Sequence, residues 1–96
     1  MTYLDEQAKT YIYLYELVNS QETIDEKYPP KNIILKEITN NIKELISEIK
    51  GDENKCNEIL RLKNNKYVSK ETIENAEKDL DCLQSLRWEL EDIIYY

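Results

Sequence analysis

Residues 69–96 read SKETIENAEKDLDCLQSLRWELEDIIYY. Ser69 offers a hydroxyl of the kind that caps the first turn of a helix. After it, apolar side chains recur every three or four residues, the period that places them on one face of an α-helix. These apolar positions are Ile73, Ala76, Leu80, Leu83, Leu86, Leu90, Ile93 and Ile94. The segment therefore predicts one long amphipathic helix with a face that packs on other helices.

Two aromatic residues of this segment fall away from its apolar face. Trp88 and Tyr95 are seven residues apart, so on a helix they lie nearly above one another, about 100° from the apolar seam. Glu74, Asp81 and Glu91 border the same stripe. Either another element covers Trp88, or the stripe is a partner-binding surface, because tryptophan and tyrosine often anchor protein interfaces. The sequence leaves both interpretations open, and these five residues are the candidate partner-binding site.

A second helix is predicted over residues 31–50, directly after the adjacent prolines Pro29 and Pro30, which favour extended backbone. Its apolar residues follow a heptad spacing. They are Ile34 or Leu35, Ile38, Ile42, Leu45 and Ile49. Gly51, the only glycine, stands where a left-handed residue commonly ends a helix. Asp52 would then cap a separate short helix. Its apolar residues would be Cys56, Ile59, Leu60 and Leu62.

The N-terminal segment is predicted to be a helix that starts at Thr2, with Asp5 three residues later as in a capping box. Its apolar face comprises Leu4, Ala8, Tyr11, Leu14, Tyr15 and Val18. Residues 10–15 also alternate like a strand, but no other segment offers them a strand partner, so the helix is preferred. Since some of these apolar groups lie off the main face, the helix is expected to pack on more than one side. The candidate self-association residues are Tyr11, Ile12, Tyr13 and Tyr15.

Together these segments predict an all-α fold in one domain, residues 1–96. The expected architecture is a small antiparallel bundle of three long helices and one short helix. One glycine and two prolines leave few turn residues for an all-β fold. Hydrophobic residues make up 41 % of the chain and charged residues 34 %, as in globular proteins rather than in disordered ones.

The cellular location expected from the sequence is the cytoplasm, without a membrane partner. The longest apolar run is far shorter than the roughly 20 residues that span a bilayer. The first residues, MTYLDEQ, lack the basic start of a signal peptide. Eleven lysines stand against two arginines, and isoleucine, asparagine and tyrosine are frequent, which suggests an AT-rich genome such as that of a low-GC bacterium or its phage.

The residue types favour a protein that is not an enzyme. The chain has no histidine, so the commonest general base and metal ligand is missing. Cys56 and Cys82 form no CxxC pair and are expected to be buried as small hydrophobic residues, with a disulfide between them not favoured. No glycine-rich loop is present to bind phosphate. We expect no catalytic residues, no metal site and no cofactor.

One local pattern suggests a different class of protein. Residues 67–76, YVSKETIENA, resemble the entry to the recognition helix of helix-turn-helix regulators, where a V-S-x-x-T-[VI] pattern is frequent. The resemblance implies DNA binding, with Lys63, Lys66 and Lys70 near the phosphates. The same helix, however, carries three glutamates, which phosphates repel. These are Glu71, Glu74 and Glu77. A DNA-binding regulator is therefore the alternative, and DNA is not the favoured partner.

Acidic residues are concentrated at the two ends of the chain. The net charge is −7 overall, −4 over residues 1–28 and −5 over residues 69–96, with the middle slightly basic. If the terminal helices are neighbours, they form one acidic side, which attracts a basic partner. We therefore expect a small acidic inhibitor or adaptor, of the kind a phage encodes against host defences, that binds a basic protein surface. A structural homo-oligomer is the third interpretation.

Overall fold

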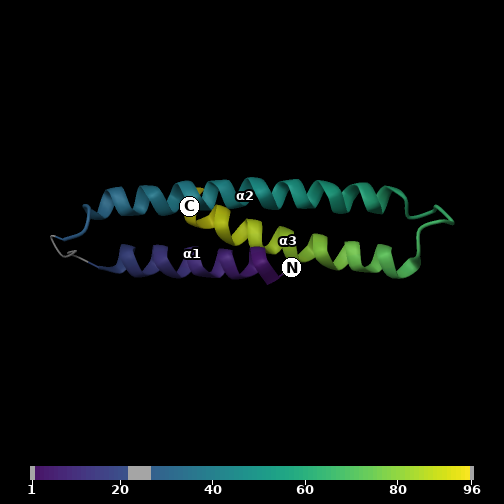
Figure 1. Ribbon diagram of the computed structural model, residues 1–96, viewed down its shortest axis with the longest axis horizontal. Helices are drawn as coiled ribbons and strands as arrows, with labels where there is room; N and C mark the ends of the chain where they lie inside the picture. Colours follow the sequence, from purple (N-terminus) through teal and green to yellow (C-terminus); the bar gives the residue numbers. More distant parts are fainter. Residues whose placement is uncertain (1, 22–26, 96) are drawn as a thin grey trace.

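The computed structural model describes residues 2–21 and 27–95, and these residues form three α-helices (Figure 1). Helix α1 spans Thr2–Ser20, α2 spans Lys31–Arg61 and α3 spans Lys70–Tyr95. No strand occurs in the described residues, so the all-α prediction is confirmed. Residues 10–15, whose alternation is also compatible with a strand, are helical throughout.

Helix α2 does not end at Gly51, and the predicted separate short helix is wrong. Gly51 has no positive φ, and the helix continues ten residues further, to Arg61. The cause lies in the apolar seam, since Ile49 and Cys56 are both buried on the same side of the helix. A glycine inside a helix costs about 1 kcal/mol relative to alanine. Burying the apolar residues of the following turns outweighs this cost.

The helix starts follow the local sequence signals. Helix α2 begins directly after Pro30, whose φ of −53° and ψ of 148° keep it extended. At the start of α3, the backbone N–H of Thr72 donates to the Ser69 hydroxyl at 3.1 Å, which confirms Ser69 as the N-cap. Helix α1 begins at Thr2 as predicted. The predicted capping contact involves the Thr2 side chain, which is not among the side chains that the structure describes.

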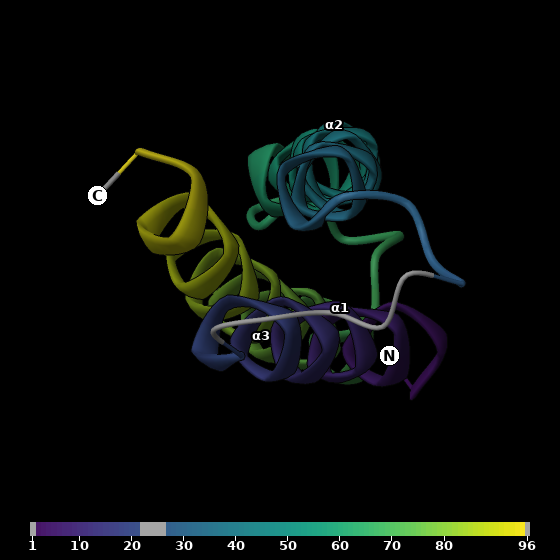
Figure 2. The same cartoon turned by 90° about the vertical axis from the view of Figure 1, so that its left-hand side faces the viewer.

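The core runs along the inner faces of all three helices. Its most completely buried large residues are Ile42 and Ile49 of α2 and Leu83 and Leu90 of α3. Helix α1 contributes Leu4 and Ala8. In the end-on view of Figure 2, α1, α2 and the C-terminal turns of α3 lie at the corners of a triangle around this core. The heptad seam predicted for α2 is confirmed, because its central and C-terminal members are buried.

The molecule is a rod in which α1 and α3 share the length of α2. Its principal extents are 62 × 20 × 17 Å. Helix α2, about 46 Å long from its 31 residues, has α1 antiparallel beside its first half. Helix α3 runs antiparallel to α2 from the C-terminal end of α2 past its middle (Figure 1). The free ends of α1 and α3 overlap only near the middle of the rod. The tip formed by the α2–α3 connection therefore contains two helices, and only the middle contains three.

Candidate functional site

The tryptophan of α3 faces outward. Trp88 is 57 % exposed and Tyr95 is 66 % exposed. The interpretation in which another element covers Trp88 is therefore wrong within the described residues. Trp88 and Tyr95 continue a line of exposed side chains that begins at Glu74 and Asp81. We call these four residues the α3 stripe.

The stripe follows from the seven-residue spacing of its members. Seven residues advance a helix by about 700°, which is about 20° short of two full turns. The four side chains therefore lie almost in line along the helix. The buried positions of α3, such as Ala76, Leu83 and Leu90, lie on the opposite side. The same periodicity that builds the core thus places this row in solvent.

Glu91, the fifth predicted site residue, lies apart from the stripe because it belongs to an internal ion network. The Arg87 Nη1 group donates to both carboxylate oxygens of Glu91 at 3.3 Å. The Arg87 Nε group donates to the two oxygens of Glu53 on α2 at 2.9 and 3.1 Å. Hydrogen bonding to Glu53 is the main cause that raises the pKa of Arg87, and Glu91 adds to it against the opposing effect of burial. Glu91 therefore supports the helix packing, with only part of its surface left for a partner.

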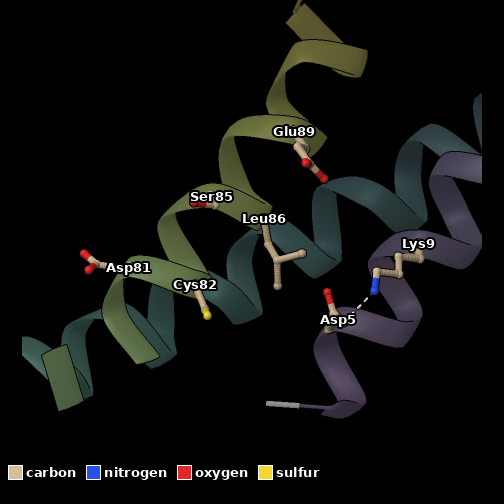
Figure 3. Close-up of a pocket in the computed structure, with 7 residues that line it drawn as sticks. All are labelled: Asp5, Lys9, Asp81, Cys82, Ser85, Leu86 and Glu89. Carbon is tan, nitrogen blue, oxygen red and sulfur yellow. Dashed lines mark ion pairs between the residues drawn. The ribbon is translucent and has the colours of Figure 1, made fainter. Parts of the chain in front are cut away.

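A groove lies beside the stripe, between the first turns of α1 and the middle of α3 (Figure 3). It has a volume of about 560 Å³. Its lining comes from α1 through Asp5 and Lys9, and from α3 through Asp81, Cys82, Ser85, Leu86 and Glu89. Asp81 belongs to both the stripe and the groove. The sequence could not reveal this groove, because its two walls are more than seventy residues apart along the chain.

The two cysteines have different surroundings, and neither forms a disulfide. Cys56 is buried as expected, and burial, followed by the charges of Asp79, Asp52 and Glu53, raises the pKa of its thiol. Cys82 is exposed, so its predicted burial is wrong. It lines the groove, on the side of α3 where the end of α1 leaves the surface open.

The tyrosine-rich helix does not present its four candidate residues as one surface. Tyr11, Ile12 and Tyr15 pack against the core and are only partly exposed. Tyr13 is 64 % exposed. The outer face of α1 also exposes Tyr3 and Leu17. Self-association through α1 would therefore use Tyr13 with these two residues, rather than the predicted set of four.

The segment that resembles a helix-turn-helix lacks the separate short first helix of that motif, because α2 is continuous up to Arg61. Lys63 forms an ion pair with Glu77 at 3.2 Å. The ammonium group of Lys66 lies 5.1 Å from the centre of the Tyr67 ring. Two of the three lysines assigned to DNA thus have partners within the chain, and the arrangement gives no support to DNA binding.

The described residues offer no group of histidine, cysteine, aspartate and glutamate side chains placed to hold a metal ion. Within the same residues, none of the helices combines the length and apolar character needed to cross a membrane. Comparisons of the chain with protein-family models, curated proteins and solved structures give no match. The function must therefore be argued from the surface of α3.

Proposed function

We propose that this chain is a non-enzymatic, acidic helical interaction module, a small inhibitor or adaptor that binds a basic protein surface through α3. The observation that supports it most strongly is the exposure of Trp88, 57 % of whose surface faces solvent in line with Glu74, Asp81 and Tyr95. Exposed aromatic residues are the usual source of large binding energies at interfaces. A tryptophan also loses little side-chain entropy when a partner covers it.

The charge of α3 determines the kind of partner. Residues 69–96 carry eight acidic and three basic side chains. Arg87 is bound by Glu53 and Glu91. The exposed face is therefore strongly negative and repels nucleic acid and anionic lipid surfaces. A basic protein surface is attracted, and salt is expected to slow the association.

The proposal is tested by replacing Trp88 with alanine. Trp88→Ala removes the aromatic side chain but keeps a strong helix former at an exposed position, so α3 should remain folded. The partner is first isolated from the cell of origin by affinity capture and then purified. Calorimetric titration should show that Trp88→Ala weakens binding by about 2 kcal/mol, roughly thirtyfold in Kd.

The matched control is Tyr67→Ala, which removes an aromatic side chain that is 85 % exposed outside α3. This variant should bind the partner as tightly as the unmodified chain. Circular dichroism should show both variants to be as helical as the parent. Unchanged affinity of a folded Trp88→Ala protein would refute the proposed role of α3, and unfolding of that variant would show that Trp88 serves the fold instead.

A further inference from the structure

The groove between α1 and α3 combines an apolar floor with an acidic rim. Figure 3 shows that Leu86 and Glu89 project from α3 toward the first turns of α1. The Cys82 thiol lies one turn away from Leu86 on the same side of α3. Asp81 marks the outer edge and points away from α1. A long side chain entering the groove would therefore meet apolar groups along its length and the Glu89 carboxylate at the rim.

The charges around this groove are unbalanced. Lys9 is already bound by Asp5, with 3.0 Å between its ammonium nitrogen and a carboxylate oxygen. Asp81 and Glu89 form no ion pair within the described residues. Glu89 therefore presents an uncompensated carboxylate on the groove side of α3, and Asp81 adds negative charge at the outer edge. A cation beside Glu89 would gain attraction without breaking an existing pair.

We propose that the groove receives an arginine or lysine side chain of the partner protein. Its aliphatic stem would lie on Leu86 and Cys82, and its charged end would meet the Glu89 carboxylate. A second copy of this chain fits poorly, since two molecules of net charge −7 repel one another. This inference rests on the proposed function and adds to it, because Asp81 connects the groove to the α3 stripe.

Cys82 provides a local reporter of groove occupancy. Its thiol is exposed in the groove, whereas Cys56 is buried with a raised pKa and should react far more slowly. The probe is the acetylated, amidated peptide Lys-Leu-Ala-Lys-Leu, and the reagent is the uncharged N-ethylmaleimide. With the peptide at about ten times its Kd, the alkylation of Cys82 should slow about tenfold. The acidic peptide Glu-Leu-Ala-Glu-Leu should leave the rate unchanged.

The decisive variant is Ser85→Arg. Ser85 is exposed and lies four residues from both Asp81 and Glu89, so an arginine there supplies the cation from within α3. In this variant the basic peptide should no longer slow the alkylation of Cys82. The control is Ser47→Arg, the same substitution at an exposed position of α2, which should keep the protection. Absence of protection in the unmodified chain, or equal protection in both variants, would overturn the inference.

Binding of the purified partner separates this inference from the proposed function. If Trp88→Ala and Ser85→Arg each weaken binding of the partner, the result supports the proposed function and the groove inference. Weakened binding by Trp88→Ala alone contradicts the groove as a partner site and leaves the α3 stripe in place. If Trp88→Ala binds normally while the basic peptide still protects Cys82, the proposed function fails and the groove remains a site for basic side chains.

Discussion

Arg87 connects two helices through its guanidinium group. It contacts Glu53 of α2 through one edge of its guanidinium and Glu91 of α3 through the other. Glu53 is the buried charged residue of the described core, with 9 % of its surface exposed. A carboxylate in this position is stable only while its cation is present. Arg87 therefore links α3 to α2 at one position along the rod and compensates the buried charge of Glu53.

Replacing Arg87 with alanine is expected to destabilise the protein by about 2–3 kcal/mol, because Glu53 would remain buried without its cation. The expected loss of stability is smaller than for a fully buried ion pair, because the Arg87 side chain is 20 % exposed. Urea unfolding followed by circular dichroism measures the change. The control is Lys9→Ala, which breaks an exposed pair on α1 and should cost less than about 0.5 kcal/mol. Equal effects of the two variants would contradict the role given to Arg87.

At single residues, the sequence predicted exposure well where only the helix period mattered. Trp88 and Tyr95 lie outside the core, as their positions on the helical wheel indicate. The pair of Arg87 with Glu91 lies within the spacing of one helix, but the bond from Arg87 to Glu53 depends on the packing of α2. Cys82, predicted to be buried, is exposed beside the N-terminal end of α1. A single-helix pattern contains neither of these contacts between helices.

Among the helices, α2 departs most from its expected form. Its middle contains Gly51, which is exposed and has open space where a Cβ atom would be added. The helix is continuous through this position. Local sequence could not decide between a helix end and a helix interior, since glycine is compatible with both. The burial of Cys56, one turn beyond, decides it.

Gly51→Ala gives opposite results for the two forms of α2. In the continuous helix, alanine has room and a better helix propensity, so the variant should be stabilised by about 0.5–1 kcal/mol. At a left-handed helix end, the same change would destabilise by about 1 kcal/mol. Thermal and urea unfolding give the sign. Ser47→Ala, at an exposed position of the same helix, should change stability by about half as much and calibrates the propensity effect.

The whole molecule is more extended than its chain length suggests. Its Cα radius of gyration is 17.4 Å. A compact domain of this length would have a radius of about 12.5 Å. The difference arises because α2 is long and α1 and α3 are displaced toward its opposite ends, so that they overlap over only part of their lengths (Figure 1). The sequence patterns predicted the helices but not this offset. The offset depends on where each loop places the next helix along α2. The groove between α1 and α3 depends on the same offset.

Small-angle X-ray scattering tests this shape directly. A dilute solution should give a radius of gyration near 17.4 Å, slightly increased by hydration. A value near 12.5 Å, that of a compact domain, would contradict the offset of α1 and α3. A concentration series serves as the control for association. A radius that grows with concentration would favour the homo-oligomer, with the exposed side chains Tyr3, Tyr13 and Leu17 of α1 as its contact.

The position of α2 along the whole rod also affects how the protein unfolds. Both other helices bury their apolar faces on α2, α1 on its first half and α3 from its C-terminal end past its middle. Local melting of the central turns, around Ile42 and Ile49, would remove the support of both neighbours together. An elongated molecule built in this way should behave as one cooperative unit, so far-ultraviolet circular dichroism should record a single denaturation transition instead of two.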